Sequence, residues 1–506
     1  MKLSAEDHQK LKDKGISEDV FNNQLQTFKD GIPHVKVLDY AHIGKGIMQI
    51  DDKRLDEFYE IYEQSDIEVL KFIPASGAAT RMFKDLHQFL DEIEVDEDSI
   101  LNALKKDKFD NLKPLIDHLN KLAFFKQALD LAQKQVDDFD KYSKTEQAVQ
   151  VLKTALSENG LNLANLPKGL IAFHQYDDKI LTAFEEHIEE AKFYATKNNK
   201  AQLHFTISEE HESNFKTALD QFLKTGNTEN IDFKVDFSYQ KPSTDTVAVN
   251  MDNSPYRDKD DDLFFRPGGH GALVHNLNRI DADLIFIKNI DNVSKKETDK
   301  QDTITFKKVL GGLLIKLQKQ IFDYQEALES NPTDDLIKEV KSFMTDSLLI
   351  KEPSESAKDI IKQLHKPIRI CGMVKNDGAP GGGPFWIEDK NGKQSLQIVE
   401  TSQMDLKDKT QKQILDNATH FNPVDIICGI KDYKGQKFDL LNYVNPKRGF
   451  ITQKSIEGQA IKALELPGLW NGAMEYWHSI FVEVPFSTFN PVKTVVDLLK
   501  PAHQDD

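Results

Sequence analysis

The stretch FIPASGAATRM, from Phe72 to Met82, combines a strand-like start with small residues and a positive charge. The small side chains leave the backbone accessible, and free backbone N–H groups ahead of a helix attract negative charge. The stretch could therefore hold a phosphate, although a tight turn from a strand into a helix explains the small residues equally well. The candidate phosphate loop consists of Ser76, Gly77, Ala78, Ala79, Thr80 and Arg81.

Three charged residues lie where strand-like runs begin or end, which is where ligands bind in doubly wound sheets. Lys168 precedes the run GLIAFH, Asp291 follows the apolar run DLIFIKNI, and Lys493 lies near the end of the chain. A carboxylate at a strand end suits Mg²⁺, which prefers oxygen ligands. Taken singly, each residue has a plainer explanation. Lys168 could be a surface lysine, Asp291 could form an Asx turn, and Lys493 could follow a turn stiffened by Pro491.

Two glycine-rich segments and one glutamate could contact a substrate. In FFRPGGHGAL, the glycines around His270 permit backbone contact with a ring or a phosphate, but a tight turn explains them as well. In NDGAPGGGPFW, the glycines at 381–383 suit either a loop that closes over a substrate or an exposed hairpin. Glu400 in IVETSQ could accept hydrogen bonds from sugar hydroxyls, or it could be a solvated residue of an edge strand.

The spacing of apolar residues indicates the helices and strands that carry these side chains. From Leu86 to about Glu158, apolar residues recur every three or four positions, which predicts a block of amphipathic helices. Strand-like and helical segments alternate after it, which predicts a mostly parallel sheet covered by helices on both faces. The run DLIFIKNI is apolar at nearly every position, as expected of a central strand. A helical region at about 300–365 and three further strands, IRICGMVK, SLQIVETSQ and DIICGI, complete the pattern.

Composition limits the possible partners. The chain has 506 residues, with 65 Lys and Arg against 83 Asp and Glu, so its formal charge of −18 disfavours binding to nucleic acid. The opening MKLSAEDHQKLKDKG lacks the apolar core of a secretion signal, and no run is long enough to span a membrane, so a cytoplasmic protein is expected. Cys371 and Cys428 lack the spacing of a zinc site and are expected to be buried and reduced.

Taken in order, these motifs resemble those of the nucleotidyltransferases that make nucleotide sugars, and most closely the UDP-sugar pyrophosphorylase group. The chain as a whole is similar to an uncharacterised bacterial domain family that shares this core. Six elements carry the resemblance: SGAATR for the opening glycine loop, Pro167-Lys168, Gly269-His270-Gly271, Asn289 with Asp291-Asn292, Val399-Glu400, and FNPVKTVVDLL with Lys493.

The resemblance implies a Rossmann-like nucleotide-diphospho-sugar transferase core with a mixed, mostly parallel sheet. With the helical segments indicated by the spacing of apolar residues, the expected domains are a helical cap at 1–68, a core at 69–430 with a helical insertion at about 85–160, and a C-terminal segment at 431–506. Arg81, Lys168 and Lys493 would be catalytic, and Asp291 would bind Mg²⁺. The nucleotide would contact Ser76, Gly77, Ala78, Ala79, Thr80, Gln240, Gly269, His270 and Gly271, and the sugar would contact Asn289, Gly382, Gly383, Glu400 and Asn422.

The sequence departs from the family pattern in two places. Ser76 and Ala79 replace glycines of the opening loop, and an alanine there would crowd a triphosphate if its backbone needed a positive φ. About 85 residues separate this loop from Lys168, where the family commonly has a short connection.

The resemblance implies that a sugar 1-phosphate reacts with an NTP, expected to be UTP, to give a nucleotide sugar and pyrophosphate. A glycosyltransferase and a non-catalytic nucleotide-binding protein of the same fold remain alternatives. The segment with Lys493 argues against the first, and the altered glycine loop would permit the second.

Overall fold

The computed structural model describes residues 3–225, 230–376, 378, 381–456 and 458–505. The chain forms two compact units, each assembled from three chain segments. Unit 1 comprises Met1–Leu70, Ser238–Ile287 and Lys307–Val484, and unit 2 comprises Lys71–Phe237, Lys288–Phe306 and Pro485–Asp506. The domain boundaries expected at 68 and 430 stay a prediction.

Unit 1 contains mixed β-structure. Strand β14 (Ile368–Lys375) pairs parallel to β20 (His478–Glu483) and antiparallel to β17 (His420–Gly429), and β17 also pairs antiparallel to β13 (Leu284–Ile287). All ten residues of β17 and all four of β13 are buried, as the apolar runs predict. Beside β20 run two short parallel strands, β3 (Gly46–Met48) and then β2 (His42–Ile43). The other strands form smaller sheets: β1 (Lys36–Tyr40), β15 (Gly383–Glu388) and β16 (Gln394–Val399); β10 (Thr246–Val247) and β12 (Phe265–Arg266); and β11 (Val249–Asn250), β18 (Phe450–Ile456) and β19 (Gln459–Glu465).

Local sequence signals define the helices of unit 1. Helix α1 begins at a capping box of Ser4 and Asp7 and ends at Gly15, whose φ of +69° is left-handed. The predicted helical region at 300–365 forms three helices, of which α12 is the longest and begins in unit 2. The helices are α1 (Ala5–Lys14), α2 (Glu18–Asp30), α3 (Asp52–Gln64), α11 (Val274–Leu277), α12 (Glu297–Ser330), α13 (Asp334–Asp346), α14 (Ala357–Leu364) and α15 (Lys409–Asp416).

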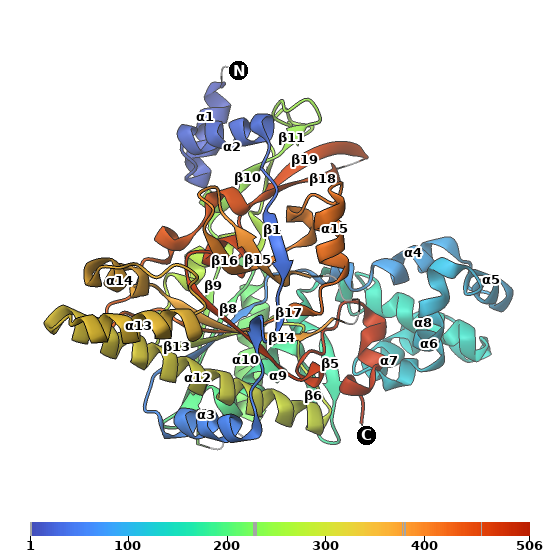
Figure 1. Cartoon of the computed structure of the whole chain (residues 1–506). Coiled ribbons are helices and arrows are strands. Elements are labelled where there is room, and N and C mark those ends of the chain that lie inside the picture. The colour runs from blue at the N-terminus through green and yellow to red at the C-terminus, as the bar shows by residue number, and fades with distance from the viewer. Residues whose placement is uncertain (1–2, 226–229, 377, 379–380, 457, 506) are drawn as a thin grey trace. The chain divides into compact units, whose positions relative to one another are not determined.

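Unit 2 combines several strands with the helical insertion. Strand β4 (Val69–Pro74), which belongs to unit 2 from Lys71 onward, pairs parallel to β8 (Lys200–Thr206), and β8 pairs antiparallel to β7 (Thr196–Lys197). The predicted helical block is present and gathers as one group in Figure 1. The remaining elements are α4 (Lys84–Glu92), α5 (Glu97–Ala103), α6 (Lys113–Asp117), α7 (Phe125–Gln135), α8 (Lys144–Leu156), α9 (Ala183–Tyr194), α10 (Glu212–Thr225), β5 (Ala172–Gln175), β6 (Ile180–Thr182) and β9 (Asp232–Ser238).

Several expectations from the sequence are confirmed by the fold. The mixed α/β class is correct, with parallel and antiparallel pairs in the same sheet. Cys371 and Cys428 are free and buried, and burial raises the pKa of Cys371 to about 11. None of the helices in the described part of the chain has the length and apolar character needed to cross a membrane. The expected N-terminal helical cap also contains strands, since β1, β2 and β3 lie within it.

Candidate functional site

Unit 2 brings together three of the predicted residues, Lys168, Asp291 and Lys493, which we call the lysine–aspartate cluster. The Nζ atoms of Lys168 and Lys493 lie 3.0 Å and 3.2 Å from the same carboxylate oxygen, Oδ2 of Asp291. Lys168 Nζ also donates to the carbonyl oxygen of Val492 at 2.8 Å. Two ammonium groups from distant parts of the chain therefore converge on one carboxylate.

Backbone pairing holds the segments that carry Asp291 and Lys493 in place. Val492 N–H donates to the Asp291 carbonyl at 3.0 Å, and Asn292 forms an antiparallel bridge with Pro491. The side chain of Asn292 accepts the Asn490 N–H at 2.8 Å, so the side chain of Asn292, rather than that of Asp291, holds the two segments together. The Asp291 carboxylate is thus left to the two lysines.

The candidate phosphate loop is fastened to the segment that carries Lys168. Ala79 N–H donates to the Leu166 carbonyl at 3.0 Å, and Lys168 N–H donates to the Gly77 carbonyl at 3.0 Å. The N–H groups of Ser76, Gly77 and Ala78 donate no hydrogen bond to any residue that the structure describes. These donors are available to an anion.

The end of the candidate phosphate loop differs from the expectation. The last three residues of the loop form a single 3-10 turn, Ala79–Arg81, and α4 begins only at Lys84. The dipole of a long helix therefore does not end at the loop. Neither Ala78 nor Ala79 has a positive φ, so the replacement of glycine by Ala79 causes no backbone strain. Arg81 is exposed, and the Thr80 hydroxyl lies 3.5 Å from the Ala164 carbonyl oxygen.

Electrostatics stabilise the charged form of Asp291. Burial would raise the pKa of its carboxyl, but the charges of Lys493 and Lys168 outweigh burial and hold the pKa below its ordinary value. The Asp291 residue is 7 % exposed, whereas the side chains of Lys168 and Lys493 are 14 % and 57 % exposed. Lys493 is thus the member of the cluster that a ligand from solvent reaches most easily.

Asp291 is the predicted residue that could hold a magnesium ion shared with phosphate groups. Both lysines bind the Asp291 carboxylate through Oδ2, which leaves Oδ1 as a possible oxygen ligand. Mg²⁺ at nucleotide sites commonly takes one or two carboxylates and completes its shell with phosphate and water. No group of three or more His, Cys, Asp or Glu side chains that could surround a metal occurs among the described residues. Asp291 would therefore be a single protein ligand.

Unit 1 brings together two predicted residues, His270 and Glu400, with Trp470 and Asn471, and we call these four residues the histidine cluster. The rings of His270 and Trp470 stack at a centroid distance of 4.2 Å and an angle of 13°. His270 Nδ1 accepts the Leu469 N–H at 3.2 Å, so the proton of a neutral ring resides on Nε2, which lies 3.5 Å from Glu400 Oε1. Asn471 Nδ2 donates to the same oxygen at 3.0 Å.

Trp470 and Asn471 were not among the residues predicted from the sequence. The stretch PGLWNGAM, with a Gly-Leu-Trp sequence and an Asn-Gly pair, marks a turn with an aromatic residue, and this signal could have identified them. The plainer explanation of Glu400 as a solvated edge residue does not describe its contacts, because two cluster side chains approach its carboxylate.

The glycines around His270 are required by packing within the chain. A Cβ on Gly271 would lie 2.6 Å from the Pro467 carbonyl oxygen, and Gly269 has a φ of +69°. Gln240 lies in the same unit, and its Nε2 is buried without a hydrogen-bond partner among the described residues. No hydrogen bond of the described residues joins Gln240 to the histidine cluster.

The residues predicted to contact the sugar are divided between the units. Gly382 and Gly383 lie beside β16, and a Cβ on Gly382 would come 3.6 Å from Glu400 Cγ. Asn422 N–H donates to the Gly382 carbonyl at 2.8 Å, and its Nδ2 has no partner among the described residues. Asn289 belongs to unit 2, where its carbonyl accepts the Asn292 N–H. Residues 377, 379 and 380 of the NDGAPGGGPFW motif lie outside the described residues.

Gly468 controls the position of the His270 ring. A Cβ at this glycine would lie 2.1 Å from His270 Cε1 and 2.6 Å from Asn471 Oδ1. We therefore expect Gly468→Ala to lower the free energy of unfolding by about 1 to 3 kcal/mol in urea titrations, as overpacking does. Gly77→Ala is the control, because a Cβ there meets no described atom within 4 Å, and we expect a change within about 0.5 kcal/mol. Equal stabilities would show that the His270 ring is not held in place.

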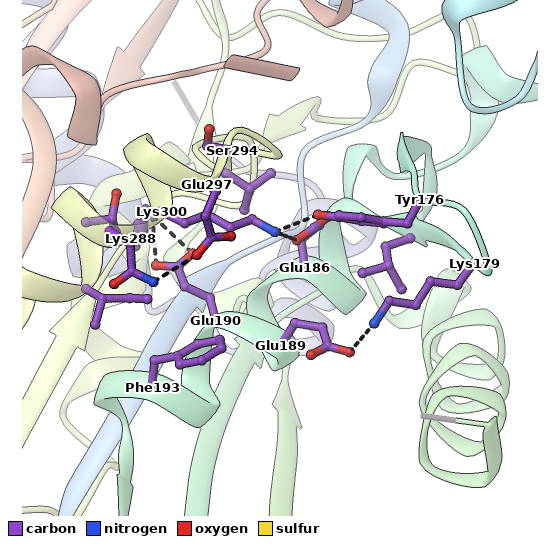
Figure 2. Close-up of a pocket in the computed structure, with 15 residues that line it drawn as sticks. Tyr176, Lys179, Glu186, Glu189, Glu190, Phe193, Lys288, Ser294, Glu297 and Lys300 are labelled. Atoms are coloured by element: carbon purple, nitrogen blue, oxygen red, sulfur yellow. Dashed lines mark hydrogen bonds and ion pairs between the residues drawn. The ribbon is translucent and has the colours of Figure 1, made fainter. Parts of the chain in front are cut away.

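A pocket of about 210 Å³ with several charged residues in its wall lies in unit 2, apart from the predicted residues (Figure 2). Its lysines are matched by carboxylates: Lys288 Nζ lies 2.8 Å from Glu190 and Lys179 Nζ 2.9 Å from Glu189. Burial would raise the pKa of Glu190, but the charges of Lys288 and Lys71 outweigh it and lower the pKa. Glu186 is likewise surrounded by donors, from His174, Tyr176 and Lys300. The charges of this pocket are satisfied within the protein.

Comparisons with known proteins found solved structures that are distantly similar to the chain and one family whose model matches it. The chain is similar to a point mutant of UDP-glucose pyrophosphorylase from Leishmania major in complex with UDP-glucose, at 13 % identity and a TM-score of 0.45, over 100 % of this chain and 80 % of that chain. It is also similar to UDP-glucose phosphorylase from Trypanosoma brucei, at 12 % identity and a TM-score of 0.47, over 97 % and 77 % of the two chains. No curated protein matches the chain. The model of the family described as a domain of unknown function, DUF4301, matches residues 4–504, and the chain therefore belongs to this family.

Proposed function

We propose that the chain is a nucleotidyltransferase that makes a nucleotide sugar and pyrophosphate from a sugar 1-phosphate and an NTP, with UTP as the expected nucleotide. The observation that carries the proposal is the convergence of Lys168 and Lys493 on Asp291, at 3.0 Å and 3.2 Å. The candidate phosphate loop is hydrogen-bonded to the Lys168 segment, which supports a role of the same region in binding phosphates.

The proposed reaction is a displacement at phosphorus without redox change. A phosphate oxygen of the sugar 1-phosphate forms a bond to the α-phosphorus of the nucleotide, and the bond from that phosphorus to the oxygen bridging to the β-phosphate breaks. The electron pair of that bond leaves with pyrophosphate. Such a reaction depends on alignment and charge neutralisation more than on covalent help from the protein.

The residues of unit 2 are proposed to supply that neutralisation. The free N–H groups of the phosphate loop, with Arg81, would bind the triphosphate, and Lys168 and Lys493 would offset charge at the α-phosphate. Two unit charges about 4 Å apart interact by about 4 kcal/mol at an effective dielectric constant of about 20, so each cation contributes substantially. Asp291 would hold Mg²⁺ through Oδ1, and the bound ion would supply further neutralisation of phosphate oxygens.

The residues of unit 1 are proposed to recognise the organic parts of the substrates. Gln240 and the loop at Gly269–Gly271 would contact the base and ribose. Glu400 would accept hydrogen bonds from sugar hydroxyls, and Asn422, whose backbone N–H donates to the Gly382 carbonyl, would lie beside the sugar. Gly382 and Gly383 would allow the sugar to approach the backbone.

Pyrophosphate release tests the proposal. The full chain is incubated with Mg²⁺, each of the four NTPs and a panel of sugar 1-phosphates, and we expect release that requires both substrates and is fastest with UTP. Binding of UTP without turnover on any sugar 1-phosphate would favour the non-catalytic alternative. Consumption of UDP-sugars with release of UDP, in the absence of pyrophosphate chemistry, would favour the glycosyltransferase. Either result would overturn the proposal.

A further inference from the structure

Helix α9 contacts the segment that carries Asp291 through His187, a residue with no part in the reaction proposed above. The His187 side chain is completely buried within unit 2. Its Nε2 atom lies 3.2 Å from the carbonyl oxygen of Asn289 and 3.2 Å from that of Ile290. These are the two residues that directly precede Asp291 in the chain. One imidazole nitrogen therefore contacts the backbone next to the proposed metal ligand.

The contacts of the His187 ring assign its proton. Carbonyl oxygens only accept hydrogen bonds, so Nε2 carries the hydrogen that the two carbonyl groups share. Burial, and next the charge of Lys71, hold the pKa of His187 well below its ordinary value, so the ring is neutral and has only this proton. Nδ1 is buried and has no hydrogen-bond partner among the described residues. The polar contacts of the ring are thus directed at the residues before Asp291.

Hydrogen bonds hold the peptide planes on both sides of the Asp291 α-carbon. The Ile290 carbonyl lies in the same plane as the Asp291 N–H, and His187 binds this carbonyl. The Asp291 carbonyl belongs to the next plane, and the Val492 N–H donates to it at 3.0 Å. Because both planes are held, φ and ψ of Asp291 are fixed, and with them the direction of its Cα–Cβ bond. The backbone itself therefore directs the carboxylate of Asp291.

Helix α9 holds the same segment at a second point, through Glu190. This residue follows His187 by three positions and therefore lies on the same face of the helix. Its two carboxylate oxygens lie 2.8 Å and 3.1 Å from Nζ of Lys288 (Figure 2). Lys71, which is buried in β4, donates to the His187 carbonyl at 3.0 Å and so ties the helix to that strand. The His187 ring is thus carried by a helix whose own position is fixed.

We propose that His187 is a positioning residue for Asp291. Its Nε2–H fixes the backbone before Asp291, so that the carboxylate meets Lys168 and Lys493 and is correctly placed for a metal ion before any ligand binds. His187 contacts no substrate and acts only through Asp291. The metal-binding role of Asp291 rests on the proposed function, whereas the backbone contacts of His187 do not depend on it. Without the Nε2–H, the peptide group between Ile290 and Asp291 is free to reorient.

Matched variants of His187 separate its hydrogen bond from its packing. His187→Met removes the donor, whereas His187→Gln keeps one, because the amide nitrogen of glutamine can occupy the position of Nε2. Methionine and glutamine are both unbranched and similar in length. His187→Phe, which keeps a planar ring, is a second variant without the donor. Phe184→Leu is the control for a general loss of stability, since Phe184 is buried in the same helix but packs on Phe205 and Phe215.

Amide hydrogen exchange on the full chain without ligand tests the positioning directly. The N–H groups of Asn292 and Val492 donate to the carbonyls of Asn289 and Asp291, so peptides that contain them report on the held backbone. We expect their exchange to be at least about tenfold faster in His187→Met and His187→Phe, but nearly unchanged in His187→Gln and in the control. Unchanged exchange in the two variants without the donor would overturn the proposal. Equal acceleration in all four variants would assign the effect to packing and would also overturn it.

Calorimetric titration with UTP distinguishes a failure of this positioning role from a failure of the proposed function. With Mg²⁺ present, His187→Met should weaken UTP binding by about ten- to a hundredfold, the range typical of losing a group that orients a metal ligand, and His187→Gln should restore most of the affinity. Without Mg²⁺, both variants should bind UTP like the unaltered protein. Equal losses with and without Mg²⁺ would contradict the positioning role. An unaltered protein whose UTP binding ignores Mg²⁺ would overturn the metal-binding role of Asp291 in the proposed function, whereas the exchange rates support or overturn the positioning by His187.

Discussion

Replacing Lys493 with alanine should lower turnover by about two to three powers of ten, while UTP affinity changes much less. The ammonium group lies 3.2 Å from Asp291 Oδ2, and its side chain is 57 % exposed, so it is accessible to incoming phosphate. A lysine is a compact point charge, suited to charge that builds up on the α-phosphate in the transition state. Pyrophosphate release at saturating substrate measures the rate, and calorimetric titration measures the affinity.

Lys216→Ala is the matched control for this variant. Lys216 lies in the same unit, forms one ion pair with Glu212 at 2.8 Å, and its side chain is 60 % exposed. Loss of such a surface pair changes stability by less than about 1 kcal/mol and should leave turnover unchanged. If a folded Lys493→Ala protein retained nearly normal turnover, the catalytic assignment of Lys493 would be wrong and only the nucleotide-binding part of the proposal would stand.

Most of the α/β pattern could be predicted from the sequence because its strands are apolar. The runs that form β8, β13, β14 and β17 are buried over most of their length, and continuous burial leaves a continuous apolar signal. The strands β1, β2 and β3 carry no such signal, since they are short and partly polar. Strand β1 pairs with β15 and β3 pairs with β20, both of which lie far along the chain, and β2 pairs with β3; local propensity does not report such distant pairing.

The residues of the candidate site could be predicted only from motifs that occur in the same order as in a known family. Lys493 and Asp291 are 202 positions apart, and nothing in the periodicity of either segment indicates that they meet. Both residues were predicted from the order of six motifs. That order did not indicate that both lysines would donate to the same carboxylate oxygen. The stacking of Trp470 on His270 was missed, because a turn-forming segment shows no periodic signal for the partner that its aromatic residue contacts.

Asp291→Asn should lower the free energy of unfolding by about 3 kcal/mol at neutral pH and abolish Mg²⁺-dependent UTP binding. The substitution keeps the shape of the side chain and removes its charge. Lys168, whose side chain is 14 % exposed, would then have no counter-ion at this position. Urea titrations measure the stability, and calorimetric titrations with UTP, with and without Mg²⁺, measure the binding. Glu212→Gln is the control, since it removes an exposed ion pair and should change stability by no more than about 0.5 kcal/mol.

The pH dependence of the stability difference between the unaltered protein and Asp291→Asn identifies the Asp291 carboxylate as the source of that difference. The two lysines hold the folded-state pKa of Asp291 below its ordinary value, so its contribution to stability is fully present above an unfolded-state pKa of about 4. The contribution is lost as pH falls through the lower pKa of the folded state. The stability gap between the unaltered protein and Asp291→Asn should therefore narrow below about pH 4 and stay constant above about pH 5. A gap that did not change with pH would mean that Asp291→Asn acts through packing rather than charge. UTP binding that kept its Mg²⁺ dependence in the variant would show that the metal is held elsewhere.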